Sequence, residues 1–152
     1  MSGLTRLAER YGVLRAVKFG VAGIIGFAVA EAIIITGLFL INGTLELPSG
    51  YSSSPSLLAV DIFAFVIGVT VGFFVNERTT VKDAPSRENG GCTAVRLVKY
   101  QGVYVVGNAI TIGTQLVLLA AFALSPVIGV LVGAVVAYPV SYVISMRFVW
   151  KV

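Results

Sequence analysis

The sequence contains no histidine, a single cysteine, Cys92, and few charged residues, which make up 12% of its 152 residues. Without histidine, the chain has neither an imidazole general base nor a histidine-ligated metal site. A single cysteine excludes a disulfide bond within the chain. The sequence also lacks a credible carboxylate pair, a paired nucleophile and base, and a nucleotide-type glycine loop. We therefore expect no enzyme activity, no metal and no cofactor.

Apolar residues are abundant instead and make up 57% of the chain. A water-soluble domain of this length could not bury so much apolar surface. The apolar residues gather in separate runs of roughly 20 residues, the length that an α-helix needs to cross a hydrocarbon core of ~30 Å. These runs cover residues 19–41, 57–75, 103–124 and 127–146. The sequence therefore predicts an all-α membrane protein, in which residues 1–152 form a single domain with four transmembrane helices.

The basic residues predict the orientation of this domain. All 11 Lys and Arg residues lie in the N-terminal segment, the loop between the second and third spans, or the C-terminal end. The positive-inside rule places these parts on the cytoplasmic side. We therefore expect a multi-pass protein of the cell membrane with both termini in the cytoplasm. The net charge of +4 then reflects attraction to the anionic inner leaflet, and we expect no nucleic-acid partner.

Two amphipathic segments flank the spans. Residues 2–18 carry leucine and basic residues at helical spacing, which is typical of a helix lying on the cytoplasmic leaflet. A second amphipathic stretch begins at Ala94 and leads into the third span through Arg96 and Lys99. The sequence thus predicts short interfacial helices in addition to the spans.

Small residues recur at every fourth position in two of the spans. In the first span they are Ala22, Gly26 and Ala30. In the fourth span they are Gly129, Gly133, Ala137, Ser141 and Ser145. Ridges of small residues let membrane helices approach closely. Because four helices make a thin wall, we also expect a homodimer, formed through the small residues of the second or fourth span.

A polar stripe follows one side of the third span. Its residues are three and four positions apart and therefore share one helix face: Gln101, Tyr104, Asn108, Thr111 and Gln115. The other faces of this helix are apolar. The stripe either lines a polar path through the bundle or supplies hydrogen bonds between neighbouring helices.

Two carboxylates lie within the predicted spans. Glu31 is near the middle of the first span, where a charged side chain costs about 2.5–3.5 kcal/mol on insertion scales. It either lines a polar path and couples a proton, or is a neutral acid that bonds Asn108 or Gln115. Asp61 lies near the outer end of the second span. It acts there either as a gate or through its charge at a helix N-terminus.

The two halves of the sequence resemble each other. Lys18-Phe19-Gly20 opens the first pair of spans, and Lys99-Tyr100-Gln101 opens the second. Arg78 closes the second span and Arg147 closes the fourth. Each half crosses the membrane from inside to outside and back. The sequence therefore predicts two hairpins related as a parallel repeat.

From Leu14 to Trp150 the chain resembles the GtrA-like family of small four-helix membrane proteins. The marks are Lys18-Phe19-Gly20-Val21-Ala22-Gly23 and the closing motif Asn76-Glu77-Arg78-Thr79-Thr80, which recurs in variant form as Ser145-Met146-Arg147-Phe148-Val149-Trp150. Two positions depart from the family pattern: Thr79-Thr80 lacks an aromatic residue, and Ser145 replaces asparagine. The resemblance implies a role in moving a polyprenyl-phosphate-linked sugar across the membrane for polysaccharide or glycoprotein synthesis at the cell surface.

Four cations are candidate ligands for the lipid phosphate. Each lies at the cytoplasmic end of one span: Lys18, Arg78, Lys99 and Arg147. A guanidinium group suits this role because it can bond two phosphate oxygens at once. Alternatively, all four are ordinary anchors that reach the lipid headgroups. Asn76 either caps the loop or binds substrate, and Trp150 is expected to be an interfacial anchor.

These observations leave three functional hypotheses. The leading one is translocation of a polyprenyl-phosphate-linked sugar, with Glu31, Asp61, Asn76 and the polar stripe along its path. The second is a membrane anchor that recruits a glycosyltransferase and transports nothing. The third is a small proton-coupled multidrug exporter, against which the one-sided charge distribution argues. The expected partners are membrane lipid, the lipid-linked sugar, a glycosyltransferase and a second copy of the chain.

Overall fold

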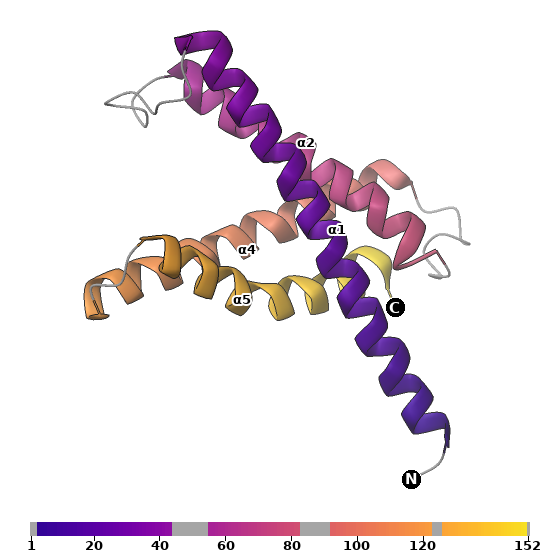
Figure 1. Ribbon diagram of the computed structural model, residues 1–152. Helices are drawn as coiled ribbons and strands as arrows, with labels where there is room; N and C mark the ends of the chain where they lie inside the picture. The colour runs from indigo at the N-terminus through magenta and orange to yellow at the C-terminus, as the bar shows by residue number, and fades with distance from the viewer. Residues whose placement is uncertain (1–2, 44–54, 83–91, 123–125, 152) are drawn as a thin grey trace. The chain divides into compact units, whose positions relative to one another are not determined.

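The computed structural model describes residues 3–43, 55–82, 92–122 and 126–151 (Figure 1). Its elements are α1 (Gly3–Asn42), α2 (Pro55–Thr79), α4 (Thr93–Phe122), α5 (Pro126–Ile144) and the π-helix η2 (Ser145–Trp150). Four helical segments are long and apolar enough to cross a membrane: Gly12–Ile41, Pro55–Thr79, Thr93–Phe122 and Ile128–Trp150. The prediction of an all-α membrane protein with four spans is therefore confirmed.

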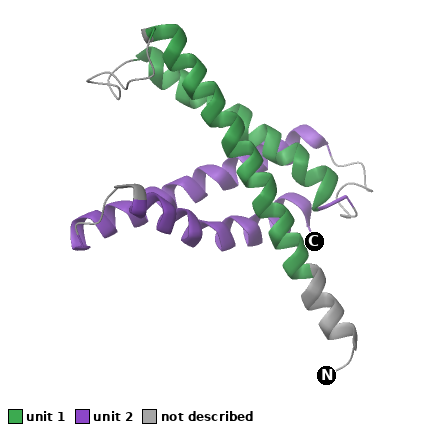
Figure 2. Cartoon of the chain, viewed as in Figure 1, with its two compact units in different colours: residues 1–80 green, residues 81–152 purple. Residues whose placement is uncertain are grey.

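The chain divides into two compact units, residues 1–80 and 81–152 (Figure 2). In the first unit, α1 packs against α2. In the second, α4 packs against α5 and η2. The helices of each pair are antiparallel, because residues late in one helix meet residues early in the other. The parallel arrangement of the repeat within the membrane stays a prediction.

The helices extend beyond the apolar runs. We predicted a separate interfacial helix over residues 2–18, but these residues from Gly3 onward form the first part of α1, which continues without a break to Asn42. The physical reason is that no proline and no cluster of turn-forming residues separates the two segments, and isolated glycines such as Gly20 are tolerated within a helix. Likewise α4 begins at Thr93, so the amphipathic stretch from Ala94 is the first part of α4 and not a separate interfacial helix.

A glycine ends α1. Gly43 has φ of +69°, and its N–H donates to the carbonyl oxygen of Phe39 at 2.9 Å. This left-handed conformation closes a helix at little cost only when the residue has no Cβ. Asn42-Gly43 therefore fixes the C-terminal end of the first span.

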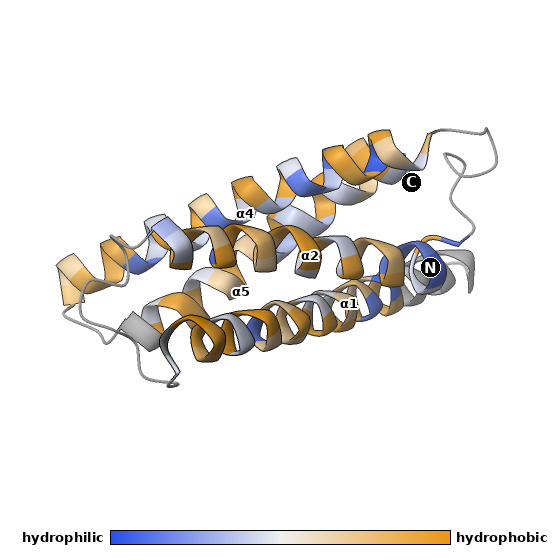
Figure 3. Ribbon diagram, turned by 90° about the horizontal axis from the view of Figure 1, so that it is seen from above, coloured by the Kyte–Doolittle hydropathy of each residue, from blue (hydrophilic) through white to orange (hydrophobic). Residues whose placement is uncertain are grey.

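The outer surfaces of the helices are apolar. Large aliphatic and aromatic side chains such as Ile24, Leu40, Leu131 and Val135 are exposed. Figure 3 shows helices that are mostly hydrophobic, interrupted by isolated hydrophilic turns, most clearly along α4. In water such a surface would cause aggregation, whereas hydrocarbon tails cover it at no cost. The surface therefore agrees with a multi-pass membrane protein.

Small residues bring α1 and α2 into backbone contact. A Cβ added to Gly26 would lie 2.5 Å from the carbonyl oxygen of Gly68, and one added to Gly68 would lie 2.6 Å from the carbonyl oxygen of Gly26. Ala22 of α1 and Gly72 of α2 are buried next to this crossing. The ridge predicted in the first span thus packs against the glycines of the second.

The ridge of the fourth span is used in the same way. A Cβ on Gly133 would lie 2.6 Å from the carbonyl oxygen of Thr111, and a Cβ on Gly107 would lie 2.6 Å from Oγ of Ser141. Gly129 packs against the side chain of Gln115. Both small-residue ridges are therefore occupied within their own helix pair. A homodimer stays a prediction, and it would need a different surface from the one we expected.

The π-helix changes which residues face α4. In η2 the N–H of Lys151 donates to the carbonyl oxygen of Met146, five residues earlier. Such a turn brings residues five apart onto about the same face, whereas an α-helix repeats every ~3.6 residues. Ser145 and Trp150 are accordingly both buried. The η2 turn therefore directs the only tryptophan into the second helix pair.

Candidate functional site

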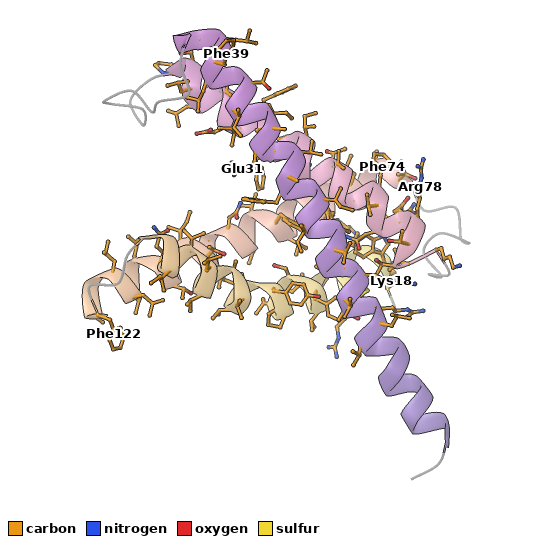
Figure 4. The ribbon with its side chains drawn as sticks, in the orientation of Figure 1. Lys18, Glu31, Phe39, Phe74, Arg78 and Phe122 are labelled. Carbon is orange, nitrogen blue, oxygen red and sulfur yellow. The ribbon has the colours of Figure 1, made fainter. Side chains whose placement is uncertain are left out.

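The four predicted phosphate ligands, Lys18, Arg78, Lys99 and Arg147, are all exposed. Lys18 and Arg78 lie at one end of the α1–α2 pair and Phe39 at the other (Figure 4). In the second unit, Lys99 is in the early part of α4 and Arg147 is in η2, which packs against α4. Each helix pair therefore presents one lysine and one arginine at the same end.

A buried residue lies close in sequence to each exposed cation, and it occupies the same position relative to the cation in both helix pairs. Phe19, which follows Lys18, is 2% exposed, and Tyr100, which follows Lys99, is 0% exposed. Asn76 and Ser145, each two residues before an arginine, are also fully buried. The two halves of the sequence repeat therefore have the same pattern of buried and exposed residues. The buried residues anchor the backbone beside each cation, and the charge stays at the surface.

Asn76 has a structural contact that favours the capping interpretation. Thr80 donates a hydrogen bond from its hydroxyl to Oδ1 of Asn76 at 2.8 Å, and both side chains are buried. The N–H of Thr80 also donates to the carbonyl oxygen of Asn76. The side-chain amide thus holds the turn that ends α2, while Arg78 lies exposed within it.

The second unit carries an aromatic cluster formed by Tyr100, Tyr104 and Trp150. Tyr100 donates a hydrogen bond from its hydroxyl to that of Tyr104 at 3.0 Å, and the centroids of these rings are 4.8 Å apart. The Tyr100 and Trp150 ring centroids are 5.2 Å apart. Trp150 is 1% exposed, so our expectation that it is an interfacial anchor was wrong. The i+5 geometry of η2 turns its ring inward.

Sequence reasoning did not select Arg96. Its side chain is only 7% exposed, and Nη2 donates to Oγ1 of Thr93 at 3.2 Å. A signal was present, because Arg96 precedes Lys99 by three residues just as Arg15 precedes Lys18. Arg15 is half-buried in the first unit. A second, more buried cation thus accompanies each exposed lysine.

The predicted polar stripe of α4 does not serve a single surface. Thr111 and Gln115 contact glycines of α5, and Oγ1 of Thr111 donates to the carbonyl oxygen of Gly107 at 3.1 Å. Gln101 is half-buried, whereas Asn108 is exposed. Part of the stripe therefore packs the helix pair, and part remains accessible on it.

Glu31 and Asp61 are half-buried within the first unit. Figure 4 shows Glu31 between Lys18 and Phe39 along α1. At a rise of ~1.5 Å per residue Glu31 lies about 20 Å along the helix from Lys18, within the apolar segment Gly12–Ile41. Asp61 follows Val60, which packs against Gly37 near the C-terminal end of α1. Their roles along a polar path stay predictions.

Cys92 lies just before α4 and is exposed. Its carbonyl oxygen accepts hydrogen bonds from the N–H groups of Val95 and Arg96. Backbone N–H groups of the first turn, above all that of Val95, lower the pKa of the Cys92 thiol. Over the described ranges, no three His, Cys, Asp or Glu residues come together in a way that could hold a metal ion.

Comparison with known proteins identifies the family. The family model described as "GtrA/DPMS, transmembrane domain" matches residues 18–150, which is nearly the whole chain. No curated protein matches the chain significantly. The matched region begins at Lys18 and ends at Trp150, so it contains all four predicted phosphate ligands and the aromatic cluster. The chain therefore belongs to the GtrA-like family of membrane proteins.

Proposed function

We propose that this protein takes part in moving a polyprenyl-phosphate-linked sugar across the membrane, without catalysing a covalent reaction. The observation that carries this proposal is the repeated end of the two helix pairs. Each pair places an exposed lysine and an exposed arginine beside buried residues in a protein of the GtrA/DPMS transmembrane family.

The cations suit the phosphate of such a lipid. Lys18, Arg78, Lys99 and Arg147 lie within about two turns of the ends of the membrane-spanning helices, close to the depth at which a polyprenyl phosphate places its anion. An arginine can donate two parallel hydrogen bonds to phosphate oxygens, and charge-assisted bonds of this kind are among the stronger ones in proteins. The tail of the lipid meanwhile contacts the apolar outer surface.

Polar groups within the spans suit the sugar. Glu31 on α1 and Asn108 on α4 retain exposed surface in segments that are otherwise apolar. A head group crossing the membrane must exchange its hydrogen bonds to water for others, and these side chains offer them. We place the termini and the cationic ends on the cytoplasmic side, in accordance with the distribution of Lys and Arg.

Reconstitution tests this function. The protein is inserted into liposomes containing a fluorescent polyprenyl-phosphate-linked glucose, and a membrane-impermeant quencher reports how fast the lipid exchanges between leaflets. We expect faster exchange with the wild-type protein than with empty liposomes. Each of Arg78→Gln and Arg147→Gln should slow exchange about 10-fold or more, because a charged hydrogen bond contributes roughly 1.5–3 kcal/mol.

Lys151→Gln serves as the matched control, because Lys151 is an exposed cation just after η2 and lies outside the repeated motif. It should exchange lipid like the wild type. Binding of the lipid without faster exchange would refute translocation by this chain alone and favour a glycosyltransferase anchor. Equal losses in all three variants would show that only the net charge matters.

A further inference from the structure

The two helix pairs differ at their cationic ends. Positions equivalent in the repeat carry Phe19 and Tyr100, and four residues further on Gly23 and Tyr104. Only the second pair therefore has hydroxyl groups at these two places. A difference between otherwise matching copies indicates which features serve something other than the shared fold.

Packing does not require the hydroxyl of Tyr100. Phe19 fills the equivalent place beside its lysine and is as well buried, at 2% exposed against 0% for Tyr100. A buried hydroxyl costs free energy unless it is hydrogen-bonded. Tyr100 meets this requirement by donating to the hydroxyl of Tyr104 at 3.0 Å. This hydrogen bond fixes the position of the Tyr104 hydroxyl.

Tyr104 is the accessible member of the pair. It is half-buried, whereas Tyr100 has no exposed surface. Because its oxygen accepts the Tyr100 proton, the hydroxyl proton of Tyr104 is left to donate to another group. The tilted contact of the two rings, 4.8 Å between centroids, restricts rotation of the Tyr104 ring. The pair therefore presents one oriented donor and part of an aromatic ring.

The depth of this donor matches the part of the ligand next to the phosphate. Tyr104 follows Lys99 by five residues in α4, which is roughly 7–8 Å along the axis at ~1.5 Å per residue. The phosphate binds the cations in preference to Tyr104, because a charge-assisted hydrogen bond is stronger than a bond to a neutral phenol. The group that moves inward to Tyr104 is then neutral and rich in hydroxyls, and its C–H face can lie on the ring.

We propose that Tyr104, held by the buried hydroxyl of Tyr100, is the first sugar-recognising residue below the cationic end of the second helix pair. This inference rests on the proposed function. It adds a residue that would bind the sugar-linked lipid more tightly than the bare lipid phosphate. Tyr104 is a binding residue, and Tyr100 is a positioning residue that acts through it.

The test compares two classes of lipid on the same protein in detergent. The probes are a short-chain polyprenyl phosphate and the same lipid carrying glucose, mannose, galactose or arabinose, with dissociation constants measured by microscale thermophoresis. Wild-type protein should bind at least one sugar-linked lipid more tightly than the bare phosphate. Tyr100→Phe and Tyr104→Phe should each weaken binding of that sugar-linked lipid about 3- to 10-fold, which is the effect of one neutral hydrogen bond. Binding of the bare phosphate should not change.

Tyr142→Phe is the matched control. It removes a hydroxyl from the same unit. The position equivalent to Tyr142 in the first pair is Phe73, so this variant, like Tyr100→Phe, introduces the residue that the first pair carries. It should bind all probes like the wild type. A melting temperature of Tyr100→Phe equal to that of the wild type would show that the hydroxyl is not needed for folding.

The remaining outcomes overturn the inference in distinguishable ways. If the tyrosine variants weaken binding of the bare phosphate as much as binding of the sugar-linked lipid, Tyr104 binds phosphate and the sugar assignment is wrong. If the wild type binds all lipids equally, the sugar is not recognised here, although the cationic ends still bind the carrier. If the wild type binds none of them, the proposed function fails together with this inference.

Discussion

The crossing of α1 and α2 allows a sharp prediction about stability. Gly26 and Gly68 face each other at this crossing, and a Cβ on Gly26 would lie 2.5 Å from the carbonyl oxygen of Gly68. Ordinary van der Waals contact begins at 3.4 Å, so the Gly26→Ala methyl group is about 0.9 Å too close. The obstructing atom belongs to the backbone, so no side-chain rotation can relieve the clash. The two helices must move apart instead.

This separation has a cost that can be bounded. Overpacking a close-packed contact typically costs about 1–3 kcal/mol, because the neighbouring contacts are stretched when the backbone shifts. We therefore expect Gly26→Ala to lower the free energy of unfolding by about 1–3 kcal/mol, and Gly68→Ala to act similarly. The double variant should cost less than the sum, because the first methyl group has already separated the helices.

SDS titration of the detergent-solubilised protein, followed by circular dichroism, measures this effect. Gly12→Ala is the control within α1, since nothing lies within 4 Å of a Cβ added there. It should match or slightly exceed the wild type, because alanine favours a helix more than glycine does. If Gly26→Ala unfolded within about 0.5 kcal/mol of the wild type, the close crossing would not be what holds the first unit together.

Three further predictions concern the end of α2 and the start of α4. Backbone N–H groups, foremost that of Val95, lower the pKa of the Cys92 thiol, so more of it is thiolate at pH 7–8. Iodoacetamide should therefore react faster with Cys92 in the native protein than in the SDS-unfolded chain. Equal rates would contradict this. In intact cells a membrane-impermeant maleimide should label Cys92 only after permeabilisation, and labelling from outside would reverse the proposed orientation. Thr80→Val should lower the free energy of unfolding by about 1–3 kcal/mol, because it removes the buried donor to Asn76. Thr79→Val, at an exposed threonine, should change it much less in the same SDS titration.

Much of the membrane architecture could be predicted from the sequence. Span length, the clustering of cations and the small-residue ridges depend on the local order of residues, and the lipid solvent imposes the same requirements on any such chain. The four spans and the ridge of Ala22 and Gly26 accordingly appear where the sequence indicates. The four cations of the repeated motifs are likewise all exposed.

Contacts between helices depended on the tertiary structure. The polar stripe of α4 has one helical periodicity, yet Thr111 packs against α5 while Asn108 stays exposed, because the position and direction of the partner helix decide which side is covered. Trp150 looks like an anchor by its place near a membrane edge, but the π-helix η2 rotates it onto Tyr100. Local sequence sets which residues enter the membrane, whereas the crossing and winding of the helices set which of them meet.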